Sequence, residues 1–83
     1  MSEIKIRNIL KEHGRLSKDA LVLDVSDDLY QAGMTSHASV NVMLGLETEF
    51  DIEFPDSMLK RSVFQSVGAI AGAVEQLLNL AAA

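Results

Sequence analysis

The chain has 83 residues, of which 48% are hydrophobic, so it has room for one domain with a single small core. Its 12 acidic and 7 basic residues give a formal net charge of −5, which disfavours nucleic acid and membrane surfaces as partners and favours proteins with basic surfaces. Because the chain has no cysteine, it has no disulfide, no thiolate metal site and no thiol of its own for covalent chemistry.

The first predicted element is a helix over residues 3–14. Ile6, Ile9, Leu10 and His13 recur at helical spacing, and charged residues such as Arg7 take the other faces. The opening segment MSEIKIRNIL has no continuous apolar stretch and is not typical of a signal peptide. The longest apolar run, residues 67–74, is far shorter than the roughly 20 residues that span a bilayer. We therefore expect a cytoplasmic protein.

Residues 15–35 are predicted to form a long loop with scattered apolar residues. A segment of this length without regular structure is uncommon in a small domain and is usually functional or packed by its own side chains. The β-branched patch LVLDV, residues 21–25, could alternatively be a short strand. No second strand-like run exists to pair with it, however.

A second helix is predicted over residues 36–50. Its 3.6-residue repeat is marked by Val40, Met43, Leu44, Glu47 and Phe50, all apolar except the glutamate. The proline at position 55 ends any continuation, because the residue before a proline is forced into an extended conformation.

Two further helices complete an all-α prediction. Residues 57–62 are long enough for a short helix with Asp56 or Ser57 as its N-cap. The last helix, residues 66–80, begins with Ser66 as N-cap. Its apolar repeat runs through Val67, Ile70, Ala71, Val74, Leu77 and Leu78.

Ser36 stands at the head of the second helix and has several possible roles. Either Thr35 or Ser36 can cap the helix by accepting a backbone hydrogen bond, worth about 0.5–2 kcal/mol against alanine. A nucleophilic serine is disfavoured because His37 points about 100° away on the helix and Ala38 replaces the second glycine of a G-x-S-x-G elbow. His13 and His37 are isolated imidazoles, so we predict no metal site.

The remaining role for Ser36 is that of an attachment point. A helix N-terminus presents unpaired N–H groups and a partial positive charge. A phosphodiester on a serine at this position would be stabilised and oriented without a basic side chain.

The run from residue 27 to residue 56, DDLYQAGMTSHASVNVMLGLETEFDIEFPD, resembles the acyl carrier protein family, which includes peptidyl and aminoacyl carrier proteins. The lengths and apolar positions of the first helix and of residues 64–78 also fit, so the resemblance covers nearly the whole chain. The matching features are Asp28-Leu29, Gly33 three residues before the serine, Ser36 itself, Leu46-Glu47, Phe50 and the segment FDIEFPD.

This resemblance implies an acyl-carrier-like four-helix bundle with a long loop between helices one and two and a short third helix. It also implies that a phosphopantetheinyl transferase attaches 4′-phosphopantetheine from coenzyme A to Ser36. The arm would supply the thiol that the chain lacks and would hold the cargo as a thioester, while the chain itself would not be an enzyme.

The chain departs from the family pattern around the serine. The usual Asp-Ser-Leu is here Thr35-Ser36-His37, and Asn41 and Thr48 occupy positions that are often acidic in the family. We therefore expect a neutral, partly apolar recognition surface. Exposed valine or methionine there would indicate a dedicated partner that binds through apolar contact, whereas the alternative is a solvated helix face with scattered apolar residues.

The predicted cargo and partners follow from a finer resemblance. The segment GMTSHASVNVMLGLETEFDIEFPD is similar to stand-alone aminoacyl carrier proteins, which are loaded by ATP-dependent ligases related to class II aminoacyl-tRNA synthetases. A downstream transferase would then accept the cargo from a monomeric carrier. The predicted partner surface consists of Met34, Thr35, His37, Val40, Asn41, Phe54, Met58 and Arg61. A specialised fatty-acyl or polyketide carrier, or a non-covalent interaction domain without a prosthetic group, stays open as an alternative.

Overall fold

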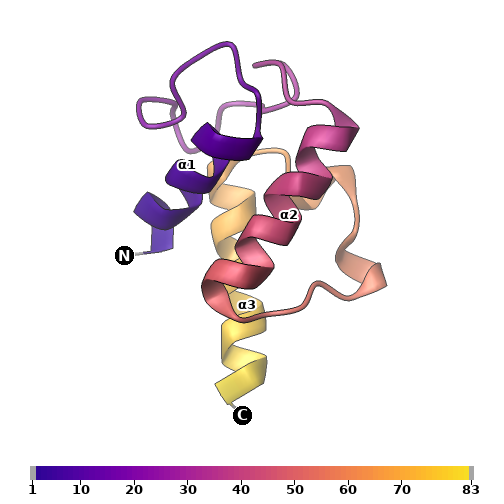
Figure 1. The fold of residues 1–83 in the computed structure, drawn as a ribbon. Helices are drawn as coiled ribbons and strands as arrows, with labels where there is room; N and C mark the ends of the chain where they lie inside the picture. The colour runs from indigo at the N-terminus through magenta and orange to yellow at the C-terminus, as the bar shows by residue number, and fades with distance from the viewer. Residues whose placement is uncertain (1, 83) are drawn as a thin grey trace.

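A computed structural model describes residues 2–82 and shows an all-α fold, as predicted (Figure 1). Within these residues the helices are α1 (Ser2–His13), α2 (Ser36–Phe50) and α3 (Val67–Ala82), and two single 3₁₀ turns, η1 (Asp56–Met58) and η2 (Arg61–Val63), lie between α2 and α3. α1 packs against both other helices, and the end of α3 extends beyond them. None of the helices in residues 2–82 is both long and apolar enough to cross a membrane.

The core is built from apolar residues that recur on one face of each helix. The last helix follows its predicted repeat closely, and Ser66 caps it by accepting a hydrogen bond from the Ala69 amide at 3.1 Å. The loop between α1 and α2 also contributes to the core. The largest fully buried side chains are Ile6 and Leu10 of α1, Val42 and Leu46 of α2, Val67, Ile70 and Val74 of α3, and Leu29 of the loop.

The buried face of α2 is not the one that carries the predicted repeat. Ala38, Val42 and Leu46 are buried, whereas Val40 and Leu44 are 49% and 50% exposed. The helix carries apolar residues on two faces, so the 3.6-residue repeat alone does not determine which face meets the core. The predicted repeat is therefore not the buried stripe of the helix: Val40, which was expected on the partner surface, is exposed, as is Leu44. Met43 and Phe50 are half-buried and pack against the edge of the core.

The predicted short helix over residues 57–62 is also corrected. η1 and η2 are separate turns because Lys60 between them is extended, at φ −124° and ψ 151°. Within residues 57–62 only Met58 is half-buried, and the other side chains are exposed. A short helix has a costly nucleus and depends on packing for its stability, and this segment has little packing to offer. The fold therefore has two 3₁₀ turns where the four-helix expectation placed a third helix.

The long loop is predicted correctly as irregular, and it is fastened to the helices by hydrogen bonds. Arg7, which was expected on an exposed face of α1, is only 7% exposed. Its Nη1 donates to the carbonyls of Ala20 at 2.9 Å and Leu23 at 2.6 Å, and its Nε donates to Glu3 at 3.0 Å. The patch LVLDV follows turns here and is not a strand. A buried cation with these partners ties α1 to the loop.

Candidate functional site

Ser36 is the first residue of α2, and its side chain is exposed. The helix is capped by the preceding residue, because Thr35 Oγ1 accepts a hydrogen bond from the Ala38 amide at 3.0 Å. One turn later, Ser39 Oγ donates to the Ser36 carbonyl at 2.7 Å. The amides of Ser36 and His37 belong to the first turn, where N–H groups have no acceptor within the helix. The Ser36 hydroxyl is thus free of the capping role and stands beside unpaired donors.

The backbone before α2 holds Ser36 in this position. The Asp28 carboxylate accepts a hydrogen bond from the Tyr30 amide at 2.9 Å and begins a turn. The turn closes at Gly33, whose φ of +112° is strained for any residue with a side chain. Met34 is then buried, with 3% of its surface exposed, and its amide donates to the Leu29 carbonyl at 3.0 Å. A fixed turn and a buried anchor therefore precede the exposed serine.

A groove of about 360 Å³ lies directly beside Ser36. It is formed by α2, the turn before it and the segment that contains η2. The guanidinium of Arg61 stacks over the Tyr30 ring, with 4.0 Å between the guanidinium carbon and the ring centroid. The remaining lining residues are Ser36, Ser39, Val40, Met43, Leu59, Lys60 and Phe64.

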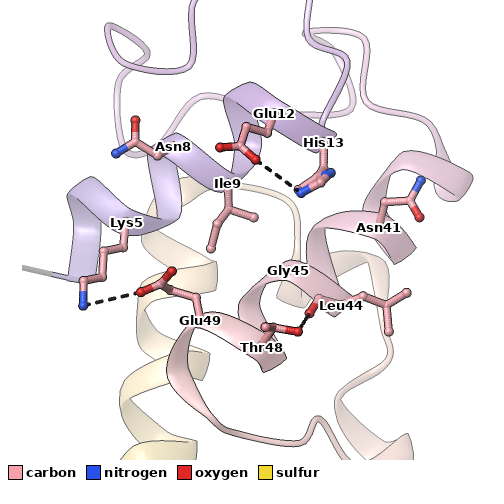
Figure 2. A pocket seen from close by; sticks show the side chains of 10 residues that line it. All are labelled: Lys5, Asn8, Ile9, Glu12, His13, Asn41, Leu44, Gly45, Thr48 and Glu49. Carbon is pink, nitrogen blue, oxygen red and sulfur yellow. Dashed lines mark hydrogen bonds and ion pairs between the residues drawn. The ribbon is translucent and has the colours of Figure 1, made fainter.

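A second groove, of about 520 Å³, lies between α1 and α2 and is more polar (Figure 2). Lys5 Nζ spans it to Glu49 at 3.6 Å, and His13 pairs with Glu12 at 3.7 Å. Ser36 is not among its lining residues. The larger groove is therefore separate from the serine that the sequence singled out.

The structure divides the predicted recognition residues into two groups. Thr35, His37, Val40 and Arg61 are exposed, and Asn41 and Met58 are half-buried, so all six reach the surface. Met34 and Phe54 do not, since only 3% and 5% of their surfaces are exposed. Phe54 packs on Phe64 at a centroid distance of 5.3 Å, and its amide donates to the Glu47 carboxylate at 2.9 Å. The expectation that the side chains of Met34 and Phe54 contact a partner is corrected, because both side chains are buried in the core.

Several groove residues were missed by the sequence prediction. Ser39 and Met43 follow Ser36 at spacings of three and seven residues, which place them on the same helix face, so that signal was present in the sequence. Tyr30, Leu59 and Lys60 come from other segments, and no spacing rule connects them to Ser36. They reach the groove only because the folded chain brings their segments next to α2.

The fold and the site define an all-helical domain with an exposed serine at the start of a helix, beside an open groove. The family model described as phosphopantetheine attachment site matches residues 5–74, and the chain belongs to this family. Its cofactor is accordingly 4′-phosphopantetheine, held covalently. The residues of the site fit this group, since the Ser36 oxygen is accessible and the adjacent amides suit a phosphodiester.

Two curated relatives are aminoacyl carrier proteins. The chain is 46% identical over 74 residues to the aminoacyl carrier protein of Agrobacterium fabrum, which covers 89% of each chain. It is 37% identical over 84 residues to aminoacyl carrier protein 1 of Bradyrhizobium diazoefficiens, which covers 99% of this chain and 93% of the relative.

Solved structures show the same fold. One is the crystal structure of an engineered Bradyrhizobium japonicum glycine:[carrier protein] ligase in complex with a carrier protein from Agrobacterium tumefaciens and ATP. The chain matched in that structure is 43% identical, with a TM-score of 0.88 over 92% of this chain and 99% of the other. Another is the solution structure of the Agrobacterium tumefaciens protein ATC2521, whose sequence is 44% identical to this chain. The two structures match with a TM-score of 0.74 over 98% of this chain and 99% of the other.

Proposed function

We propose that this protein is an aminoacyl carrier whose prosthetic group is attached to the Ser36 hydroxyl. When bound, 4′-phosphopantetheine supplies a flexible arm ending in a thiol, which holds the amino acid as a thioester. The main observation in support of the proposal is that two adjacent residues at the start of α2, Thr35 and Ser36, have different structural roles. Thr35 caps the helix, so the exposed Ser36 oxygen can be esterified without loss of the cap.

The residues around Ser36 suit a phosphodiester at this position. The amides of Ser36 and His37 point out of the helix end, where the helix dipole is positive and favours an anion. The buried Met34 fixes the backbone two residues before the serine. The chain thereby orients the attached arm, and no part of this arrangement requires a catalytic group from the chain itself. We assign the chemical steps to partner enzymes and regard the carrier as non-catalytic.

The proposed partners act on Ser36 in sequence. A phosphopantetheinyl transferase attaches the arm from coenzyme A, an ATP-dependent amino acid ligase loads it, and a downstream transferase removes the cargo. The ligase is favoured because the relatives are aminoacyl carrier proteins and one similar carrier was crystallised with a glycine:[carrier protein] ligase. We propose Thr35, His37, Val40, Asn41, Met58 and Arg61 as contacts for these enzymes, and the cytoplasm, which contains coenzyme A and ATP, as their location.

Substitution of Ser36 tests the attachment site. We expect co-expression with a phosphopantetheinyl transferase to increase the mass of the wild-type chain by one phosphopantetheinyl group, as measured by intact-protein mass spectrometry. Ser36→Ala should remove this increase completely. Ser39→Ala is the matched control, because Ser39 is a second hydroxyl lining the same groove one turn away, and it should be modified like the wild type. Modification of Ser36→Ala, or a wild-type chain left unmodified by several transferases, would contradict the proposal.

The cargo is tested in a second step of the same experiment. The modified chain is incubated with the Bradyrhizobium japonicum ligase, ATP and glycine, and the expected result is a further increase by one glycyl group. Loading by a fatty-acyl ligase in place of the glycine ligase would favour the fatty-acyl alternative. A partner that binds the Ser36→Ala chain and the wild type equally, with neither chain modified, would favour a non-covalent interaction domain.

A further inference from the structure

The groove beside Ser36 has a charge opposite to that of the whole chain. The formal net charge is −5, yet the residues that line this groove include Lys60 and Arg61 and no acid. The second groove, between α1 and α2, contains Glu12 and Glu49 in addition to the cation Lys5. The positive charge is therefore a local property of the surface next to the attachment point.

The Arg61 side chain lies against an aromatic ring at the groove. Its guanidinium stacks on Tyr30 at 4.0 Å, which fixes the plane of the group while its N–H donors at the edge can still point outward. Within residues 2–82 the lysine and arginine side chains that pair with a carboxylate are Lys5 and Arg7, so Lys60 and Arg61 have no carboxylate partner in that part of the chain. Two cations without internal partners thus border the groove.

The floor and walls of the groove are apolar and only partly covered. Val40 from α2 is 49% exposed, and Leu59 from the segment between η1 and η2 is 48% exposed. Met43, which also lines the groove, is half-buried. Apolar side chains gathered in a groove with a charged rim are typical of a protein interface.

Building on the proposed function, we propose that the ligase docks in this groove through apolar side chains flanked by carboxylates. The apolar side chains would cover Val40, Met43 and Leu59, and the carboxylates would pair with Lys60 and Arg61. Charge complementarity decides the class of partner, because a basic docking surface would meet two like charges next to the site that it must reach. The net charge of the chain, which favours basic partners, is thus a poor guide to the surface around Ser36.

Charge reversal in the groove tests this assignment. The modified carrier with Lys60→Glu and Arg61→Glu is compared with a carrier bearing Lys11→Glu and Lys18→Glu, two exposed lysines outside the groove. Both pairs of substitutions lower the net charge equally. The readout is the rate of glycine loading by the Bradyrhizobium japonicum ligase as a function of carrier concentration.

We expect the groove variant to raise the KM for the carrier roughly 10-fold with little change in kcat, since rim charges act on encounter and binding. The control variant should stay within about 2-fold of the wild type. Added salt should raise the wild-type KM and lower that of the groove variant, because charge reversal turns the attraction to the carboxylates into a repulsion that salt also screens. Circular dichroism establishes that each variant is folded, and Lys60→Gln with Arg61→Gln, which removes the charges without reversing them, should give a smaller increase in KM.

The outcomes separate this inference from the proposed function. Equal KM values for the groove and control variants, or faster loading of the groove variant, would overturn the charge assignment while leaving the carrier function intact. A wild-type carrier that acquires the arm but no glycine would contradict the aminoacyl function itself. Intact mass, measured before the kinetics, distinguishes these two failures.

Discussion

Thr35 and Ser36 are adjacent hydroxyl residues with separate tasks. Thr35 Oγ1 is engaged by the Ala38 amide at 3.0 Å, and its backbone is extended, at φ −86° and ψ 168°, as an N-cap requires. Ser36 is already helical, and its side chain is exposed. The sequence allowed either residue to be the cap, and the structure assigns the cap to Thr35.

This assignment predicts unequal costs for the two alanine substitutions. Thr35→Ala should lower the free energy of unfolding by about 1 kcal/mol, because the Ala38 amide loses its acceptor. Ser36→Ala should change it by less than about 0.5 kcal/mol, as is usual for an exposed residue without a structural partner. Urea denaturation of the unmodified chain, followed by circular dichroism, measures both. A larger loss in Ser36→Ala than in Thr35→Ala would show that the serine carries the cap.

At the level of elements, the close approach of α1 and α2 depends on Gly45. A Cβ atom placed there would lie 3.0 Å from Ile9 Cγ2 and 3.3 Å from His13 Cδ2. Gly72 of α3 has nothing within 4 Å of the same position. Both glycines lie inside helices, where glycine is less favourable than alanine, but only Gly45 is required by packing.

The two glycines therefore form a matched pair. Gly72→Ala should raise the free energy of unfolding by about 0.5–1 kcal/mol through helix propensity. Gly45→Ala has the same helical gain but must displace the buried Ile9, and overpacking of this kind costs about 1–3 kcal/mol. We expect Gly45→Ala to be at least about 1 kcal/mol less stable than Gly72→Ala in urea denaturation. Equal stabilisation by both substitutions would mean that α1 and α2 separate easily.

The helices also show how far the sequence could predict the fold. α3 was predicted well because its apolar residues occupy one face, so a single buried stripe is possible. α2 has the predicted bounds, but its repeat did not identify the buried face, because Val42 and Leu46 on one side and Val40 and Leu44 on the other are equally apolar. Local periodicity cannot determine which apolar face of α2 is buried, because that depends on how the helix packs against α1 and α3.

Arg7 illustrates the same limit for a single side chain. In the sequence it is an ordinary charged residue on the polar side of a helix, and nothing nearby accepts its hydrogen bonds except Glu3. Its other acceptors are the backbone carbonyls of Ala20 and Leu23. Because every residue has a backbone carbonyl, the sequence does not indicate which ones accept these hydrogen bonds. Burial of this cation could be predicted only once the path of the loop was known.

Across the whole molecule, the site is assembled from parts with very different sequence signals. Ser36 stood out because a motif surrounds it, and Val40 lies one helical turn away. The cationic rim comes from Lys60 and Arg61, and the ring beneath Arg61 comes from Tyr30. These segments meet only because the loop and the chain after α2 both return to the start of that helix. The exposed position of Ser36 at the start of a helix was therefore predictable, as was the place of Val40 on its helix face, whereas the contributions of Tyr30, Leu59 and Lys60 to the groove were not.

The loop of residues 15–35 connects the elements into one unit. The Leu29 amide donates to the Gln65 carbonyl at 2.7 Å, and the Gly68 amide at the start of α3 donates to the Val25 carbonyl at 2.9 Å. Together with Arg7, these bonds join the loop to α1 and to the beginning of α3. We infer that the part of the loop that precedes Ser36 is held by the same packing as the core.

Amide hydrogen exchange tests whether the loop opens with the core or independently of it. If it opens with the core, the Leu29 and Gly68 amides should exchange within roughly a factor of ten of the amide of Leu10, a fully buried residue in the last turn of α1, because all three are released by global unfolding. The exposed amides of Leu21 and Ser26 are bonded to the carboxylates of Asp19 and Asp24 only two residues away, so they should exchange at least about 100-fold faster through local opening. Uniformly fast exchange across residues 15–35, with protection confined to the helices, would show that the loop moves independently. The turn that positions Ser36 would then be mobile in the free carrier, and the orientation of its prosthetic arm would have to be set by the partner enzyme.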